Sequence, residues 1–179
     1  MIMLITGGSG CGKSSFAEQM LSLYPGERCY IATMQVADAE SEKRVQRHRA
    51  QRSHLNMITL ECPRNIGSCQ IPKDGTVLLE DLPNLLANEM FGGGHPEHIL
   101  SDIQKLANRS RHLFIVTNDV FSDGITYSEE TMLYMKTLSR LDADIAEMAD
   151  VAVELVYSIP IVLKGTLKEQ TICRKEFVR

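Results

Sequence analysis

The first chemically distinctive stretch of the chain is a glycine-rich loop near its beginning. Its residues are Gly7, Gly8, Ser9, Gly10, Cys11, Gly12, Lys13 and Ser14. Glycines allow positive φ angles, so backbone N–H groups can point inward and form a concavity for anionic oxygens. Lys13 would then reach the β- and γ-phosphates of a nucleotide, and the Ser14 hydroxyl would complete the coordination of Mg²⁺. We therefore predict that this loop binds nucleotide phosphates.

The elements expected around the loop are those that such a site requires. An apolar run over residues 2–6 predicts a strand that ends at the glycines, and apolar residues at helical spacing follow from Ser14 onward. This order places the loop at a helix N-terminus, where anions are stabilised. Because G-x-x-x-x-G-K-[ST] occurs in this setting, a phosphate-binding loop is favoured over a chance match.

Two carboxylates follow another apolar run. Glu80 and Asp81 come directly after residues 76–79. Phosphate-loop enzymes use an acidic residue at the end of a neighbouring strand to hold magnesium. We predict this role for one of the two carboxylates, together with Ser14. The alternative is that they only end a strand where it meets solvent.

A charged segment over residues 38–52 contains the remaining candidate group. Helical spacing would align His48 with Arg44 and Arg52. Five of the 19 Lys and Arg residues lie between positions 43 and 52, which makes a locally basic surface suited to a polyanion. Nearby positive charge favours the neutral imidazole, the form that can attack a nucleotide α-phosphate. From residue types alone, a solvated charged helix is the simpler interpretation.

The pattern of the whole chain predicts one α/β domain over residues 1–179. Alternating strands and helices favour a mainly parallel sheet with helices on both faces. A longer helix should begin at Ser128, with Met132, Leu133, Met135 and Met148 in its core-facing stripe. The expected strands lie at 29–33, 57–60, 77–79, 113–117, 151–157, 160–164 and 170–178, and further helices at 82–90 and 97–108.

Composition narrows the class of partner. The formal net charge of −4 and the pI of about 5.7 argue against a general affinity for nucleic acid or anionic membranes, so small molecules are the expected partners. Neither a signal peptide nor a membrane span is expected, which makes the cytoplasm the default location. The five cysteines form no C-x-x-C pair, and we expect most of them to be reduced and structural.

Six motifs occur in order over most of the chain. They are ITGGSGCGKSSFAE, YIATMQVADAESEKRVQRHRAQR, TLECP, VLLEDLPNLLANEMF, IVTNDV and MADVAVELVYSIPIVLK. Together they resemble the bifunctional adenosylcobinamide kinase/adenosylcobinamide-phosphate guanylyltransferases of cobalamin biosynthesis. The most specific signal is the joint spacing of the glycine loop, the YIAT strand and the R-V-x-x-H helix, because many unrelated kinases share a glycine loop.

This resemblance implies a P-loop NTPase-like (RecA-like) α/β fold with antiparallel C-terminal strands. It implies a transferase that phosphorylates the aminopropanol hydroxyl of adenosylcobinamide with ATP or GTP. GTP then guanylylates His48, and GMP passes to the new phosphate to give adenosylcobinamide-GDP. Lys13 would assist catalysis, Mg²⁺ would be held by Ser14 and Glu80, and a homotrimer would form the site at a subunit interface. The implied nucleotide contacts are the loop residues 7–14 and Ala32, Thr33, Met34, Arg49, Ala50, Gln51, Arg52, Glu61 and Glu80.

The chain departs from the family pattern in two places. Gly10 and Cys11 replace a basic residue and a serine in the loop, which removes one positive charge. The later departures include Met135, Lys136, Ser139, Asp142 and Ala143. Two alternatives therefore stay open: a relative that acts on a different small molecule, and a regulatory module that binds nucleotide without transferring any group.

Overall fold

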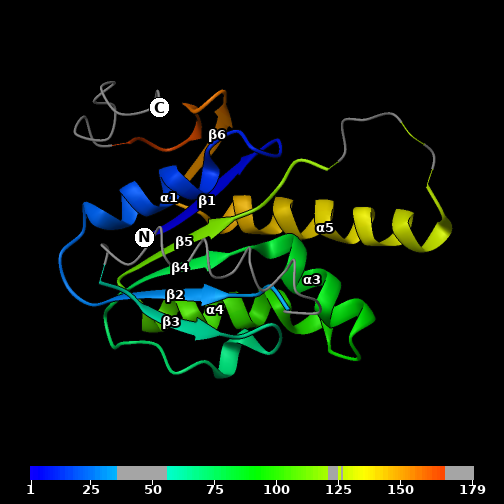
Figure 1. Ribbon diagram of the computed structural model, residues 1–179, viewed down its shortest axis with the longest axis horizontal. Helices are drawn as coiled ribbons and strands as arrows, with labels where there is room; N and C mark the ends of the chain where they lie inside the picture. Colours follow the sequence, from blue (N-terminus) through cyan, green and yellow to red (C-terminus); the bar gives the residue numbers. More distant parts are fainter. Residues whose placement is uncertain (36–55, 121–124, 126, 168–179) are drawn as a thin grey trace.

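A seven-stranded sheet forms the centre of the protein (Figure 1). The computed structural model describes residues 1–35, 56–120, 125 and 127–167. The strand order is β3-β2-β4-β5-β1-β6-β7, and every neighbouring pair is parallel except β6 and β7. The strands are β1 (Ile2–Gly7), β2 (Arg28–Ala32), β3 (Ile58–Glu61), β4 (Thr76–Glu80), β5 (His112–Val116), β6 (Val151–Val156) and β7 (Ile159–Lys164).

Helices cover both faces of this sheet (Figure 1). The α-helices are α1 (Lys13–Ser22), α3 (Leu82–Phe91), α4 (Ile99–Arg109) and α5 (Glu129–Met148), and two short 3₁₀ helices are η2 (Ile66–Ser68) and η3 (Pro96–His98). α1 packs on one face, and α3, α4 and α5 pack on the other. Among the residues that the structure describes, no helix has the length and apolar character needed to cross a membrane.

Side-chain alternation along the strands explains the two core layers. Met3 and Ile5 of β1 point to the face covered by α1, where they are buried with Phe16 and Met20. Leu4, between them, belongs to the opposite cluster with residues of α3, α4 and α5. Successive side chains of a strand point to opposite faces. Both faces are therefore apolar, as expected for a parallel sheet covered on both sides.

The register brings the functional ends of the strands together. Ala32 at the end of β2 pairs with Glu61 of β3 on one side and with Glu80 of β4 on the other. Glu80 pairs in turn with Val116 of β5. In open α/β sheets, ligands bind in the crevice beyond the carboxyl ends of the strands. The predicted parallel sheet and its antiparallel C-terminal strand are confirmed, whereas the predicted elements at 38–52 and 170–178 lie outside the described residues.

The predicted core face of α5 is wrong for its first half. Leu138, Leu141 and Ile145 are buried, but Leu133 is 57% exposed and the two methionines Met132 and Met135 are only partly covered. The reason is geometric, because the N-terminal half of α5 extends past the sheet and has no strand beneath it (Figure 1). Met148, at the other end, packs against the core as predicted.

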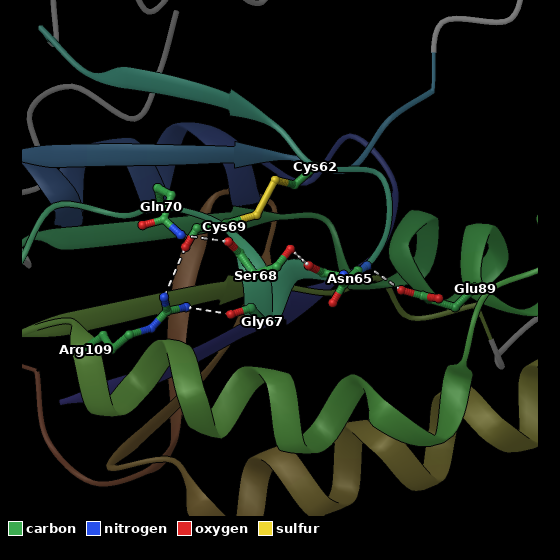
Figure 2. Close-up of a disulfide and its surroundings, with 8 residues drawn as sticks. All are labelled: Cys62, Asn65, Gly67, Ser68, Cys69, Gln70, Glu89 and Arg109. Carbon is green, nitrogen blue, oxygen red and sulfur yellow. Dashed lines mark hydrogen bonds between the residues drawn. A yellow bond between two sulfur atoms is a disulfide. The ribbon is translucent and has the colours of Figure 1, made fainter.

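The expectation of reduced cysteines is wrong for one pair. Cys62, directly after β3, forms a disulfide with Cys69, directly after η2 (Figure 2). η2 turns the chain back on itself, and Arg109 of α4 donates to the carbonyl oxygens of Gly67 and Cys69 at 2.9 and 3.2 Å. These contacts bring the two sulfurs together from positions seven residues apart. Spacing alone does not reveal this pairing, because it depends on how η2 folds.

Candidate functional site

The glycine loop joins β1 to α1 and is held by the turn between β6 and β7. Gly12 adopts φ +95° immediately before α1, and a Cβ atom there would lie 2.6 Å from Ser158 Oγ. Ser158, in the turn between β6 and β7, donates its backbone N–H to the Cys11 carbonyl oxygen at 2.9 Å. Position 12 therefore requires glycine for both its conformation and its close contact. Ser158 belongs to the motif MADVAVELVYSIPIVLK, but sequence reasoning assigned it no role.

The side chain of Lys13 folds back into the glycine loop, toward Gly7 and Gly8. Its side chain is 7% exposed, and its ammonium donates to the carbonyl oxygens of Gly7 and Gly8 at 2.9 and 2.6 Å. The Cys11 sulfur lies 3.8 Å from the same nitrogen. A buried cation whose partners in the described part of the chain are two backbone carbonyls and a thiol is well suited to attract an anion into the loop.

The two carboxylates after β4 have different surroundings. Ser14 Oγ donates a hydrogen bond to Glu80 Oε1, and within the described residues Glu80 Oε2 is buried with no hydrogen-bond partner. Asp81 instead caps α3 by accepting from the Asn84 N–H at 2.8 Å. Burial raises the pKa of Asp81, and the Asn84 hydrogen bond opposes that rise. The geometry thus favours Glu80 over Asp81 as a metal ligand.

A cavity of about 290 Å³ opens beside the loop. The lining residues come from the loop, from β4 and from the end of β5: Ser9, Gly10, Cys11, Gly12, Lys13, Ser14, Ser15, Glu80, Asp81, Val116 and Asn118. The structure therefore brings together most of the predicted phosphate and metal residues around one space. Asn118 was not predicted to contribute, although its position just beyond β5 at the carboxyl edge of the sheet is a usable signal.

The other predicted contacts lie along the same edge of the sheet. Ala32 and Met34 are partly buried around the end of β2, and Glu61 is exposed at the end of β3. Thr33 is fully buried, and its hydroxyl is engaged with both backbone groups of Asp81. Its side chain therefore fixes the loop and is not available to a ligand. The predicted residues His48, Arg49, Ala50, Gln51 and Arg52 lie outside the described part of the chain.

The positions that depart from the family pattern separate into two groups on α5. Met135, Lys136, Ser139 and Ala143 line an open depression of about 640 Å³ on the outer side of the helix. Asp142 is more buried and lies beside Thr117 at the end of β5. None of these five positions on α5 is among the described residues that line the cavity at the glycine loop.

Asp142 is expected to destabilise the fold at neutral pH. Burial raises its pKa to about 6, and the Thr117 hydroxyl partly offsets the rise. Because the folded protein favours the neutral acid, the penalty is absent below pH ~4 and complete above pH ~6. Asp142→Asn should therefore increase the free energy of unfolding by about 1–3 kcal/mol at pH 7.5. Denaturant titrations at pH 4 and pH 7.5 measure this, and an equal gain at both values would contradict it.

A glycine loop between a central parallel strand and a helix, with a carboxylate at the end of a neighbouring strand, defines the P-loop class of nucleotide-binding proteins. The fold agrees with a solved structure of an ATPase from the type III secretion system of pathogenic bacteria. The TM-score is 0.55 at 13% identity, and the match covers 96% of this chain and 60% of that one. The chain belongs to the CobU family, described as cobinamide kinase/cobinamide phosphate guanyltransferase, whose model matches residues 3–163.

Two characterised proteins are similar in sequence. The bifunctional adenosylcobalamin biosynthesis protein CobU of Salmonella typhimurium is 34% identical over 97 residues, which is 52% of this chain and 52% of that protein. The bifunctional adenosylcobalamin biosynthesis protein CobP of Pseudomonas aeruginosa is 28% identical over 172 residues, 90% of this chain and 96% of that protein. The first match thus spans about half of its relative, and the second nearly all of it.

Proposed function

We propose that this protein is a bifunctional transferase of cobalamin biosynthesis. It phosphorylates adenosylcobinamide with ATP or GTP, and it transfers GMP from GTP through His48 to adenosylcobinamide phosphate. Family membership over residues 3–163 supports the pair of activities. The observation that carries the nucleotide half is the convergence of Lys13, Ser14 and Glu80 on one cavity.

In the phosphorylation step, the chain positions and stabilises the transferring phosphoryl group. The backbone N–H groups of the loop and the α1 N-terminus face the phosphates. The Lys13 ammonium, now on the carbonyls of Gly7 and Gly8, exchanges those partners for phosphate oxygens. Once the nucleotide is bound, these donors are in place, so they stabilise the negative charge that develops in the transition state without further reorganisation.

Mg²⁺ fits the residues at the mouth of the loop. Glu80 carries one buried oxygen that has no hydrogen-bond partner within the described residues, and the Ser14 hydroxyl lies against its other oxygen. A carboxylate and a hydroxyl are the hard oxygen donors that Mg²⁺ prefers. When bound, the ion would neutralise charge on the β- and γ-phosphates. Ser14 and Glu80 are the residues that would hold it.

The guanylyl transfer proceeds by two displacements at one phosphorus atom. A neutral imidazole nitrogen of His48 attacks the α-phosphorus of GTP, so a P–N bond forms and the bond to the bridging oxygen of pyrophosphate breaks. A phosphate oxygen of the acceptor then attacks the same phosphorus, a P–O bond forms, and the P–N bond breaks. The imidazole is regenerated, and adenosylcobinamide-GDP leaves.

Incubation with α-labelled GTP and Mg²⁺ tests this function. Label should remain on the denatured protein through a bond that is labile in acid and stable in alkali, as expected for a phosphoramidate. Adenosylcobinamide and ATP should separately yield adenosylcobinamide phosphate. A labelled protein that does not phosphorylate adenosylcobinamide would indicate a different acceptor. Tight nucleotide binding without either transfer would reject the enzyme and favour a regulatory module.

Cys11 provides an independent check on where the nucleotide binds. Cys11 lines the cavity and its sulfur lies 3.8 Å from Lys13 Nζ, so alkylation with a maleimide should weaken ATP and GTP binding at least ~10-fold by filling the space beside Lys13. Bound nucleotide should slow the alkylation, as measured by peptide mass mapping. Cys11→Ser should bind nucleotide normally and resist the inhibitor. Unchanged affinity of the modified protein would place the nucleotide elsewhere.

Assembly and location complete the proposal. We place the protein in the cytoplasm as a homotrimer of single-domain chains, on the basis of the family resemblance. Exposed apolar side chains on β7, among them Ile159 and Leu163, support self-association, because such a strand at a sheet edge is prone to pairing. Sedimentation equilibrium measures the assembly, and a monomer at micromolar concentration would contradict it.

A further inference from the structure

One side chain links the loops that follow two neighbouring strands. Asn88, in the second turn of α3, donates from its amide nitrogen to the Thr33 carbonyl oxygen at 2.7 Å and to the Pro63 carbonyl oxygen at 3.0 Å. A primary amide has two N–H groups, and both are used here. Thr33 lies just beyond β2, and Pro63 lies two residues beyond β3.

Backbone hydrogen bonds extend this link to β4. The Thr33 N–H donates to the Glu80 carbonyl oxygen at 3.1 Å, and the Cys62 N–H donates to the Ala32 carbonyl oxygen at 2.9 Å. Thr33 Oγ1 also donates to the Asp81 carbonyl oxygen and accepts from the Asp81 N–H, both at 2.8 Å. The ends of β2, β3 and β4 therefore form one hydrogen-bonded unit.

Helix α3 is anchored to this unit at two positions, its N-cap and Asn88. Asp81 caps its N-terminus by accepting from the Asn84 N–H, and Asn88 binds the two loops further along the helix. Asparagine is a poor helix former, and the Asn88 side chain forms its hydrogen bonds outside its own helix. These bonds satisfy two loop carbonyls that no β-ladder satisfies at these positions.

We propose that Asn88 is a positioning residue for the nucleoside end of the bound nucleotide. It holds the carboxyl ends of β2 and β3, which carry Ala32, Met34 and Glu61, in register with Glu80 and the glycine loop. This inference rests on the proposed function and on the family resemblance, which implies that those residues contact the nucleotide. The triphosphate end depends on the glycine loop, and neither of the two hydrogen bonds from the Asn88 amide nitrogen goes to that loop.

The two ends of the nucleotide can be tested separately with Asn88→Leu, which is similar in shape and has no donor. Its affinity for GTP should fall about 10-fold, because two hydrogen bonds to the loops are lost. Its affinity for Mg²⁺-tripolyphosphate, which engages the glycine loop and Glu80 but not the ends of β2 and β3, should stay within twofold of wild type. Isothermal titration of both ligands measures the difference.

Matched variants separate positioning from a general loss of structure. Asn108→Leu makes the same change at an exposed position of α4 near the opposite edge of the sheet, and it should leave both affinities unchanged. Asn88→Asp places an acceptor against two carbonyl oxygens, so it should weaken GTP binding at least as much as Asn88→Leu. Unchanged GTP affinity in Asn88→Leu, or an equal loss for GTP and tripolyphosphate, would overturn the proposal.

The labelling of wild-type protein with α-labelled GTP distinguishes a failure of the proposed guanylyl transfer from a failure of the role proposed for Asn88. If wild type binds GTP but forms no adduct, the proposed guanylyl transfer fails. The binding ratio of GTP to tripolyphosphate in Asn88→Leu still decides the role of Asn88, because it requires no turnover.

Discussion

His48→Ala is expected to remove the covalent GMP adduct, lowering the rate of protein labelling by about 1,000-fold or more. The imidazole is the proposed nucleophile, and alanine offers no atom that can form the P–N bond. Formation of adenosylcobinamide-GDP should fall with the adduct. The measurement is retention of α-labelled GMP on denatured protein, followed in parallel with product by chromatography.

The phosphorylation of adenosylcobinamide should survive in the same variant. Lys13, Ser14 and Glu80 surround a cavity built from β1, α1 and β4, and this part of the site does not require His48. His95→Ala is a matched control, since His95 is an exposed histidine just before η3. It should label normally. Label that persists in His48→Ala would assign the nucleophile to another residue.

Lys13→Ala should reduce both transfers by roughly 10²–10³-fold, the range observed when one preorganised donor to a developing anion is removed. The Lys13 ammonium is buried within the loop, and no other described residue that lines the cavity carries a positive charge that could replace it. Initial rates of adenosylcobinamide phosphorylation and of protein guanylylation measure the two losses. A loss confined to one transfer would show that the two steps use different phosphate sites.

Two comparisons separate a loss of catalysis in Lys13→Ala from misfolding of the variant. Lys105→Ala removes an exposed lysine that pairs with Asp102 on α4, and it should leave both rates within twofold. The melting temperature of Lys13→Ala should match or exceed that of wild type, because a buried ammonium is costly to desolvate. Rates near wild type in a folded Lys13→Ala protein would contradict the role of the lysine.

The local pattern of apolar and polar residues was sufficient to predict most of the architecture. The apolar runs that precede Gly7 and Glu80 became parallel strands, and Ser128 caps α5 as predicted. Alternating elements imply a covered parallel sheet because few other arrangements bury both faces. Site residues that belong to the glycine loop were predictable for the same reason, since their roles depend on adjacent residues.

Features that depend on distant contacts were not predictable in the same way. Met132 and Met135 follow a helical period, but period does not show where the sheet beneath α5 ends. Asn88 and Ser158 act on loops that are far away in sequence, so no spacing reveals them. The Cys62–Cys69 disulfide likewise depends on the path of η2.

The hydrogen bond from the Ser158 hydroxyl to the Cys11 carbonyl oxygen spans 147 residues, and it links the glycine loop to the turn before β7. β1, which leads into the loop, pairs only with β5 and β6 among the described strands. β1 therefore completes its pairing only after β5 and β6 have been synthesised. During synthesis, the residues of the glycine loop are therefore present well before the contacts from Ser158 that hold the loop. A nascent chain that ends before Ser158 is therefore expected to lack the contacts that hold the loop in its nucleotide-binding conformation.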